Sequence, residues 1–250
     1  MAVSQGCESL GLLGVGAFGK LAAPYLAKHF NVVFFDPIQD LRLLAEEMGA
    51  RAGTLAEAAS CDVVVLAMPI QKLDAALRDV APHLLSGAVV IDVVSVKVKP
   101  KRMMELALPT YVDIVGTHPL FGPQSGKNGI AGLTIAVCNA RGDRGEAVAK
   151  FCAEKLGLNV VTTTAEEHDR QMAYVQGLTH LLAKIVVSLN LPDFSLKTKT
   201  YAYLQSMVDM VRYDSEELFK AIERENPYVA EAKNEFFEAA RSLEARLSKD

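Results

Sequence analysis

The chain of 250 residues is 50% hydrophobic and 22% charged, which is ordinary for a soluble globular protein. Its formal net charge of −4 gives no basic field for nucleic acid or for an anionic membrane surface. No apolar run approaches the ~18 residues of a membrane-spanning helix, and the first residues lack the basic start of a secretory signal. We therefore expect no nucleic-acid partner and no membrane association.

Short β-branched runs alternate with longer amphipathic stretches over residues 1–163. The expected strands are, in order, "SLGLLG", "NVVFFD", "CDVVVLAM", "GAVVIDVVS", "YVDIVG", "GLTIAVC" and "LNVVTTT". Helices are expected between the first five, at 17–29, 38–48, 73–84 and 99–106, and the last two strands flank the segment 144–156. Continuous apolar strands separated by helices indicate a mostly parallel sheet covered on both faces. We predict an α/β fold in which residues 1–163 form a Rossmann-like domain.

Helical periodicity replaces the strand pattern from residue 164 onward. Thr164 and Glu167 have the spacing of a capping box, and apolar residues then recur every three or four positions. Later helices are expected at 198–212, 215–225 and 227–247, with Pro227 in the first turn of the last one. Residues 164–250 are thus predicted to form an all-helical domain. Because its core would be thin, we expect it to pack on a second subunit as a homodimer.

Four cysteines are scattered along the chain without C-x-x-C spacing, namely Cys7, Cys61, Cys138 and Cys152. Three of them have apolar neighbours, which predicts reduced, buried thiols rather than a disulfide framework. We therefore expect the protein in a reducing compartment, namely the cytoplasm. We expect no metal site.

The stretch "LGLLGVGAFGK" places Gly14, Gly16 and Gly19 in G-x-G-x-x-G spacing at a strand-to-helix turn. In this fingerprint the first glycine permits the tight turn, and the second lets the backbone approach a pyrophosphate. The third lets the helix and strand pack closely. Ala17 and Phe18 would add backbone N–H groups at the positive end of the helix. We predict a dinucleotide site here; the alternative is a glycine-rich turn that binds nothing.

Two further features belong to the predicted cofactor site. The second strand ends in Asp36, whose carboxylate could accept both ribose hydroxyls and would repel a 2′-phosphate. This favours NAD over NADP. The third strand ends in Met68 and Pro69, at the same edge of the sheet. Ligands of doubly wound sheets bind at this edge, outside the carboxyl ends of the strands, so we include both residues in the predicted cofactor site.

The same edge should carry the reactive groups. The fourth strand ends near Ser95, and the fifth leads into His118 in the loop "GTHPLFGPQSGKNGIAG". Histidine can take a proton near neutral pH, as removal of hydride from an alcohol carbon requires, and Ser95 could bind the same hydroxyl or orient the ring. The alternatives are that His118 fills a structural niche and that Ser95 is a turn residue.

At "GTHPLFGPQSGKNG" the chain resembles the prephenate and arogenate dehydrogenases of tyrosine biosynthesis. The resemblance extends through "DVVSVK" and "EEHDRQMAYVQGLTH" and covers most of residues 8–225. It implies a dinucleotide domain joined to a helical dimerisation domain. It also implies oxidation of the C4 alcohol of a cyclohexadienyl ring, with hydride transfer to a nicotinamide cofactor and loss of the ring carboxylate as CO2.

The resemblance also assigns roles to residues. His118 matches the catalytic histidine, Ser95 its hydroxyl partner and His180 a substrate-contacting histidine, although His180 could equally be a packed side chain. Gln124 and Lys127, in the signature loop, could contact substrate or lie on the surface. His168 matches the pattern too, but it lies twelve residues before His180, so the two should not share one face of a regular α-helix.

Substrate preference is expected to depend on an acid in the helical domain, since arogenate carries an amino group where prephenate carries a keto group. Asp209 matches the acidic position that the family associates with arogenate, and Arg212 could pair with it or bind a substrate carboxylate. The alternative is a local Asp–Arg pair without a ligand. We expect arogenate to be favoured over prephenate.

Two rival functions fit part of this pattern. A β-hydroxyacid dehydrogenase or an imine reductase shares the glycine turn and a helical second domain, but would carry a catalytic lysine or acid in that domain. A module that senses NAD without chemistry would not need His118, Ser95 and His180 together. No chorismate mutase-like segment or added regulatory domain is expected from the sequence.

Overall fold

The structure, a computed structural model, describes residues 8–248 and divides into two compact units, Met1–Ala165 and Glu166–Asp250. The strands of the first unit are β1 (Ser9–Leu13), β2 (Asn31–Phe35), β3 (Arg51–Ala52), β4 (Val63–Leu66), β5 (Val89–Asp92), β6 (Asp113–Pro119), β7 (Thr134–Arg141) and β8 (Asn159–Thr162). Its α-helices are α1 (Ala17–Leu26), α2 (Arg42–Glu47), α3 (Leu55–Ala59), α4 (Ile70–Val80), α5 (Val98–Ala107) and α6 (Gly145–Glu154). The short 3-10 turn Ala81–His83 follows α4.

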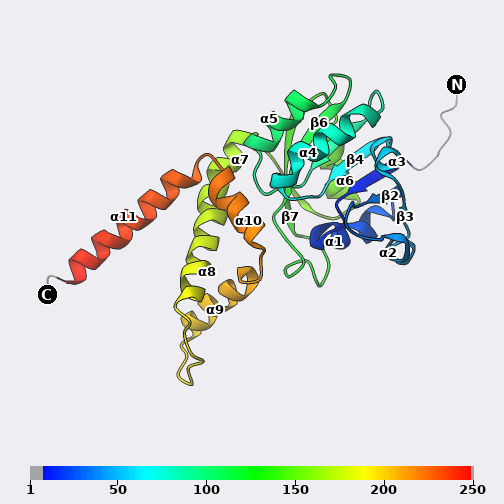
Figure 1. The fold of residues 1–250 in the computed structure, drawn as a ribbon. Helices are drawn as coiled ribbons and strands as arrows, with labels where there is room; N and C mark the ends of the chain where they lie inside the picture. Colours follow the sequence, from blue (N-terminus) through cyan, green and yellow to red (C-terminus); the bar gives the residue numbers. More distant parts are fainter. Residues whose placement is uncertain (1–7, 249–250) are drawn as a thin grey trace. The chain divides into compact units, whose positions relative to one another are not determined.

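The strands form one sheet in the order β3-β2-β1-β4-β5-β6-β7-β8 (Figure 1). The first six positions reproduce the strand order of a Rossmann fold, in which the order reverses beside β1. All neighbouring strands are parallel except β6 and β7, which pair antiparallel with a register shift between Ile114 and Val115. The prediction of a mostly parallel, Rossmann-like sheet is therefore confirmed.

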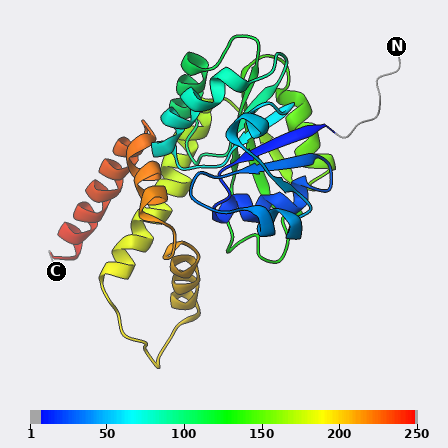
Figure 2. The same ribbon diagram turned by 45° about the vertical axis from the view of Figure 1, so that its right-hand side comes forward.

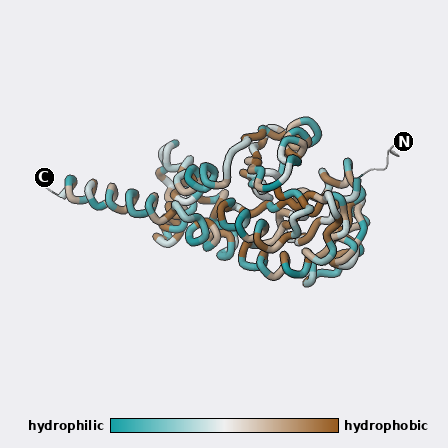
Figure 3. The backbone as a smooth tube through the Cα atoms, turned by 90° about the horizontal axis from the view of Figure 1, so that it is seen from above, coloured by the Kyte–Doolittle hydropathy of each residue, from teal (hydrophilic) through white to brown (hydrophobic). Residues whose placement is uncertain are grey.

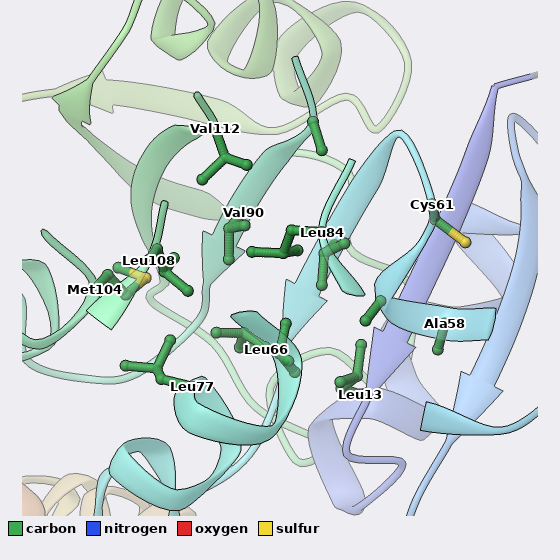
Figure 4. Close-up of a cluster of buried hydrophobic side chains, with 14 of the residues drawn as sticks. Leu13, Ala58, Cys61, Leu66, Leu77, Leu84, Val90, Met104, Leu108 and Val112 are labelled. Carbon is green, nitrogen blue, oxygen red and sulfur yellow. The ribbon is translucent and has the colours of Figure 1, made fainter. Parts of the chain in front are cut away.

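Helices cover both faces of this sheet, as continuous apolar strands require. One face packs against α3, α4 and α5, and Figure 4 shows Leu13, Leu66 and Val90 of the strands directed toward Leu77 of α4 and Met104 of α5. The other face packs against α1, α2 and α6. Figure 2 shows α1 and α2 on the side of the sheet opposite α4 and α5.

Two elements of the first unit were absent from the sequence prediction, the short edge strand β3 and the helix α3. A complete capping box starts α3: the Thr54 hydroxyl accepts the Glu57 N–H at 3.2 Å, and a Glu57 carboxylate oxygen accepts the Thr54 N–H at 2.8 Å. The Thr54 N–H, followed by the Thr54 hydroxyl and the Arg51 guanidinium, donates to the Glu57 carboxylate and lowers its pKa to about 2. The T-x-x-E spacing was visible in the sequence and is the signal that could have located this helix.

The strand before the signature loop is longer than predicted. Residues 117–119 were expected to lie in a loop, but β6 continues to Pro119 because it pairs with β7, with His118 opposite Ala136 and Pro119 opposite Ile135. His118 is thus part of a strand rather than of the loop that follows. An antiparallel partner so distant in the sequence could not be seen in the local pattern.

The second unit is entirely helical. Its segments are α7 (Ala165–Met172), the π-helical turn Ala173–Leu178, α8 (Thr179–Ser188), α9 (Lys199–Val211), α10 (Glu216–Lys220), the π-helical turn Ala221–Glu225 and α11 (Val229–Leu247). Two predictions need correction. Pro227 lies before the last helix instead of in its first turn, since Tyr228 is the N-cap. The helix expected at 215–225 changes to a π-helix after Lys220.

Polarity differs between the two units. Figure 3 shows hydrophobic residues concentrated in the interior of the first unit, whereas α11, the helix beside the C-terminus, mixes hydrophilic and hydrophobic positions along its length. Over residues 8–248, no helix combines the length and the apolar character needed to cross a membrane. Cys61, Cys138 and Cys152 are buried thiols, as predicted. Cys7 lies outside the described residues.

Candidate functional site

The carboxyl ends of the parallel strands meet at one edge of the sheet. Leu13 of β1 pairs with Phe35 of β2 and with Leu66 of β4, which in turn pairs with Asp92 of β5, and Asp92 pairs with Gly116 of β6. The residues that follow these positions, which the sequence analysis singled out, therefore share this edge although they are more than a hundred residues apart. Ligands of open α/β sheets bind at such an edge.

The glycine turn has the geometry that each glycine was expected to provide. Gly14 has a φ of +92°, and a Cβ there would lie 2.5 Å from the Ala67 carbonyl oxygen. A Cβ at Gly19 would lie 2.4 Å from the Gly14 carbonyl oxygen, so α1 starts tightly against the turn. A Cβ at Gly16, by contrast, would meet no atom within 4 Å. Gly16 therefore faces the open space that a pyrophosphate would need.

The start of α1 has N–H groups available for an anion. Gly16 is its N-cap and, among the described residues, no side chain caps this end of the helix. Ala17 and Phe18 are the first two residues of α1, and their backbone N–H groups have no intrahelical acceptor. A helix N-terminus of this kind stabilises a negative charge. The turn and the helix thus fit the diphosphate of a dinucleotide.

Asp36, after β2, is tied directly to the glycine turn. Its Oδ2 accepts the Val15 N–H at 3.0 Å and the Gln39 Nε2–H at 3.2 Å, and its Oδ1 accepts the Ile38 N–H at 2.9 Å. These bonds orient the carboxylate at the edge of a cavity of about 270 Å³. Asp36 thus lies where a ribose bound beside the glycine turn would be.

The same cavity contains a second carboxylate. The Asp40 carboxylate accepts hydrogen bonds from Nη2 of Arg42 at 2.6 Å and from its Nε at 3.1 and 3.2 Å, and this contact lowers the pKa of Asp40 to about 2. The Arg42 guanidinium is thereby engaged by a carboxylate of its own loop. The cavity therefore combines two carboxylates with one arginine.

Met68 and Pro69 follow β4 at the same edge. The Ala67 N–H donates to the Leu13 carbonyl at 2.7 Å, so the end of β4 lies beside the glycine turn. Met68 is half-buried against the core, whereas Pro69 is exposed and is the N-cap of α4. A Cβ at Gly14 would lie 3.2 Å from the Met68 backbone nitrogen, so Met68 adjoins the turn and Pro69 follows it.

His118 and Ser95 follow neighbouring strands, β6 and β5. His118 is 4% exposed and lies in β6, one residue beyond Thr117, whose hydroxyl donates to the Asp92 carbonyl at 2.8 Å. Ser95 is half-buried in the bend after β5. The structure thus brings these two residues to adjacent strand ends, with the imidazole enclosed by protein.

The signature loop packs against the helix of the glycine turn. The rings of Phe121 and Phe18 lie 6.3 Å apart, and a Cβ at Gly126 would lie 3.1 Å from a methyl group of Leu21 in α1. Gln124 and Lys127, both exposed, extend from this loop. The loop therefore adjoins the dinucleotide-binding turn.

In the second unit, His180 is held by two acceptors. Its Nδ1 lies 2.9 Å from the Gln176 carbonyl oxygen, and its Nε2 lies 3.0 Å from Oδ2 of Asp214. Both ring nitrogens are engaged, so the orientation of the ring is fixed. Asp214 was not singled out in the sequence. Its separation of 34 residues from His180 left no local signal.

His168 is also buried, and its Nδ1 lies 2.8 Å from Oδ1 of Asp169. His168 and His180 were expected on different faces of the helix on the assumption that the helix is a regular α-helix. The π-helical turn Ala173–Leu178 lies between them, so that assumption is wrong. Such turns shift the register of a helix and are frequent at functional sites.

Asp209 and Arg212 form a pair on α9 and its C-cap. Arg212 Nη1 donates to Asp209 Oδ1 at 3.0 Å, and the Asp209 side chain is 61% exposed. This arrangement corresponds to the local i,i+3 pair that the sequence analysis considered as an alternative.

Taken with the sheet order, the glycine turn and the anchored Asp36 define the first unit as a dinucleotide-binding Rossmann domain, followed in the chain by a helical unit. Comparison with protein families gives the same division. Residues 27–133 match the prephenate dehydrogenase nucleotide-binding domain, and residues 164–250 match the prephenate dehydrogenase dimerization domain. The chain belongs to the prephenate dehydrogenase family.

Individual relatives agree with this assignment. Arogenate dehydrogenase 2, chloroplastic, of Arabidopsis thaliana is 32% identical over 233 residues, which are 89% of this chain and 65% of the relative. The prephenate dehydrogenase of A. aeolicus, solved with hydroxyphenyl propionate and NAD+, has a TM-score of 0.79 at 19% identity and covers 99% of this chain and 93% of that one. The Synechocystis arogenate dehydrogenase has a TM-score of 0.71 at 18% identity, over 96% of this chain and 92% of that one. At these identities the two structures show the shared fold.

The chain is shorter than the curated relatives that it matches. It spans 65%, 54% and 39% of the lengths of three of them.

Proposed function

We propose that this chain is an NAD-dependent arogenate or prephenate dehydrogenase, an oxidoreductase that aromatises a cyclohexadienyl substrate with loss of CO2. The proposal is supported by the two matched family models, which cover residues 27–133 and 164–250. It is also supported by the position of His118, in the His-Pro-Leu-Phe-Gly-Pro run, at the same sheet edge as the glycine turn. A β-hydroxyacid dehydrogenase, an imine reductase or a non-catalytic NAD sensor is not favoured, because neither matched model describes such a protein.

The proposed chemistry uses His118 and Ser95. His118 accepts the proton of the C4 hydroxyl, and Ser95 hydrogen-bonds the same oxygen and keeps it in line with the imidazole. When bound, the nicotinamide supplies the acceptor for the hydride of C4. As C4 becomes a carbonyl carbon, the bond between the ring and its carboxylate breaks and the electron pair passes through the ring to the C4 oxygen, which takes the proton back from His118, so that CO2 leaves and the ring becomes an aromatic phenol. Burial of His118 excludes water from the proton transfer.

NAD is proposed over NADP. Asp36 presents a carboxylate that suits two ribose hydroxyls and repels a 2′-phosphate. Dehydrogenases that accept the phosphate place an arginine beside it, and the arginine in this cavity, Arg42, is already bonded to Asp40. Both observations support a preference for NAD over NADP.

Arogenate is proposed as the preferred substrate, with Asp209 as the acid that attracts its ammonium group. The exposure of Asp209 leaves the carboxylate accessible to a ligand, although Arg212 competes for it. The roles expected for His180, Gln124, Lys127 and Arg212 toward substrate stay predictions. The cytoplasm is proposed as the compartment, supported by the buried thiols.

A steady-state comparison of arogenate and prephenate, each with NAD and with NADP, tests the function. NADH formation should be fastest with arogenate and NAD, and the product should be tyrosine, released with one CO2 per NADH. Absence of turnover with both substrates would contradict the proposed activity. Asp209→Asn should shift the ratio of kcat/KM values toward prephenate, whereas Glu217→Gln, an exposed acid on α10, should leave it unchanged.

A further inference from the structure

Lys97, in the bend after β5, is a buried lysine. Its side chain is 1% exposed, which is rare for lysine unless the ammonium is paired. The Nζ contacts Oδ1 of Asp92 and donates to the Thr117 carbonyl at 2.6 Å. An ammonium in this environment is retained only because two acceptors replace the water that it loses.

These contacts join the two strands that lead to Ser95 and His118. Asp92 is the last residue of β5, and its Oδ1 also accepts the Val94 N–H at 3.0 Å. Thr117 precedes His118 in β6, and its hydroxyl donates back to the Asp92 carbonyl at 2.8 Å. The contact between Lys97 and Asp92 joins the two ends of the segment that contains Ser95. The bond from Lys97 to the Thr117 carbonyl connects this segment to the strand that contains His118.

Gly116 leaves room for this ion pair beside the imidazole. Side chains alternate along a strand, so positions 116 and 118 face the same side of the sheet. A Cβ at Gly116 would lie 3.2 Å from Cδ of Lys97 and 3.3 Å from Oδ2 of Asp92. The lysine stem and the carboxylate thus pack on the same side of the sheet as His118.

We infer that Lys97 and Asp92 are positioning residues, which hold the Ser95 hydroxyl and the His118 imidazole in register for proton transfer. The inference rests on the proposed function. A buried ion pair contributes little net stability compared with apolar residues of similar size, so stability alone does not account for it. A positioning role accounts for the buried pair, because a displacement on the order of 1 Å at a reacting group can lower a rate about a hundredfold.

The test compares Lys97→Met with the double variant Lys97→Met/Asp92→Asn. Methionine keeps the length of the stem but removes both bonds of the ammonium. The single variant leaves a buried carboxylate without its ammonium and could unfold, whereas the double variant removes that charge and keeps an oxygen for the Val94 N–H. The control is Arg78→Met, which breaks the exposed pair with Asp74 on α4.

For each variant we would measure the melting temperature, the dissociation constant for NAD, kcat and KM. We expect the folded double variant to bind NAD within about threefold of wild type, because the glycine turn and Asp36 follow β1 and β2. Its kcat should fall about a hundredfold with KM little changed. Arg78→Met should match wild type in every measurement.

Three results would overturn the inference. The first is a double variant whose kcat stays within threefold of wild type. The second is a loss of activity that merely follows the unfolded fraction or the loss of NAD binding, which would make the pair structural. The third is a wild-type protein without turnover, which would remove the proposed function and this inference with it.

Discussion

At the scale of single residues, His118 is the side chain on which the chemistry depends. His118→Asn removes the group that would accept the hydroxyl proton while keeping a polar side chain of smaller volume at a buried position. We expect kcat to fall by a factor on the order of 10² to 10⁴. NAD binding, measured by titration calorimetry, should be unchanged, because the glycine turn is separate from the imidazole. Full activity in a folded variant would remove His118 from the mechanism.

Residue-scale prediction from the sequence succeeded where a motif carries its own geometry. The space around each of the three glycines agrees with the tight turn, the open face and the close helix packing expected of them, and their contact with a dinucleotide stays a prediction. Lys97 was visible in "SVK" but was not singled out, because a lysine between apolar residues is usually solvated. Its burial depends on acceptors in β5 and β6, and a local pattern does not report such contacts.

At the scale of elements, the capping box of α3 is a local feature with a measurable effect. Thr54→Ala removes the hydroxyl that accepts the Glu57 N–H, and we expect the free energy of unfolding to fall by about 1 kcal/mol. Thr54→Ser keeps the hydroxyl oxygen and should lower the free energy of unfolding much less. Denaturant unfolding at neutral pH measures both. Equal losses in the two variants would mean that the hydroxyl is not responsible.

The pKa of Glu57 gives this capping box a dependence on pH. Since the pKa is lowered from 4.5 to about 2 in the folded chain, the contribution of the carboxylate is present above pH 4.5 and is lost as the pH falls toward 2. The bond from the Thr54 N–H to Glu57 should weaken over that interval. Because Glu57 is exposed, salt should reduce the effect.

Helices and strands with strong periodicity were predicted well, whereas short elements were not. β3 has two residues and α3 has five, too few for an apolar period to emerge. The π-helical turns were missed for a different reason. They insert a register shift into sequences that read as continuous α-helix, and only packing within the helical unit selects them.

At the scale of the whole molecule, we predict a homodimer formed through the helical unit. Residues 164–250 match a dimerization domain, and large hydrophobic side chains of this unit are exposed, including Leu196 at 93%. Light scattering should give a mass twice the 27.0 kDa of the chain. Leu196→Glu should weaken the dimer, and Leu106→Glu, equally large and 78% exposed on α5, should not. A monomer at micromolar concentration would contradict the proposal.

The sequence by itself determined the fold class, the glycine turn, the acid after the second strand and the order of the two units, because each follows from a local period or a short motif. The tertiary structure decided how far β6 extends, that His118 is enclosed, and which partners hold Lys97 and His180. Each of them depends on residues far apart in the chain, such as Pro119 and Ile135, Lys97 and Thr117, or His180 and Asp214, which come together only when strands pair and helices pack. A buried charge in particular is stable only beside the acceptors that folding places around it.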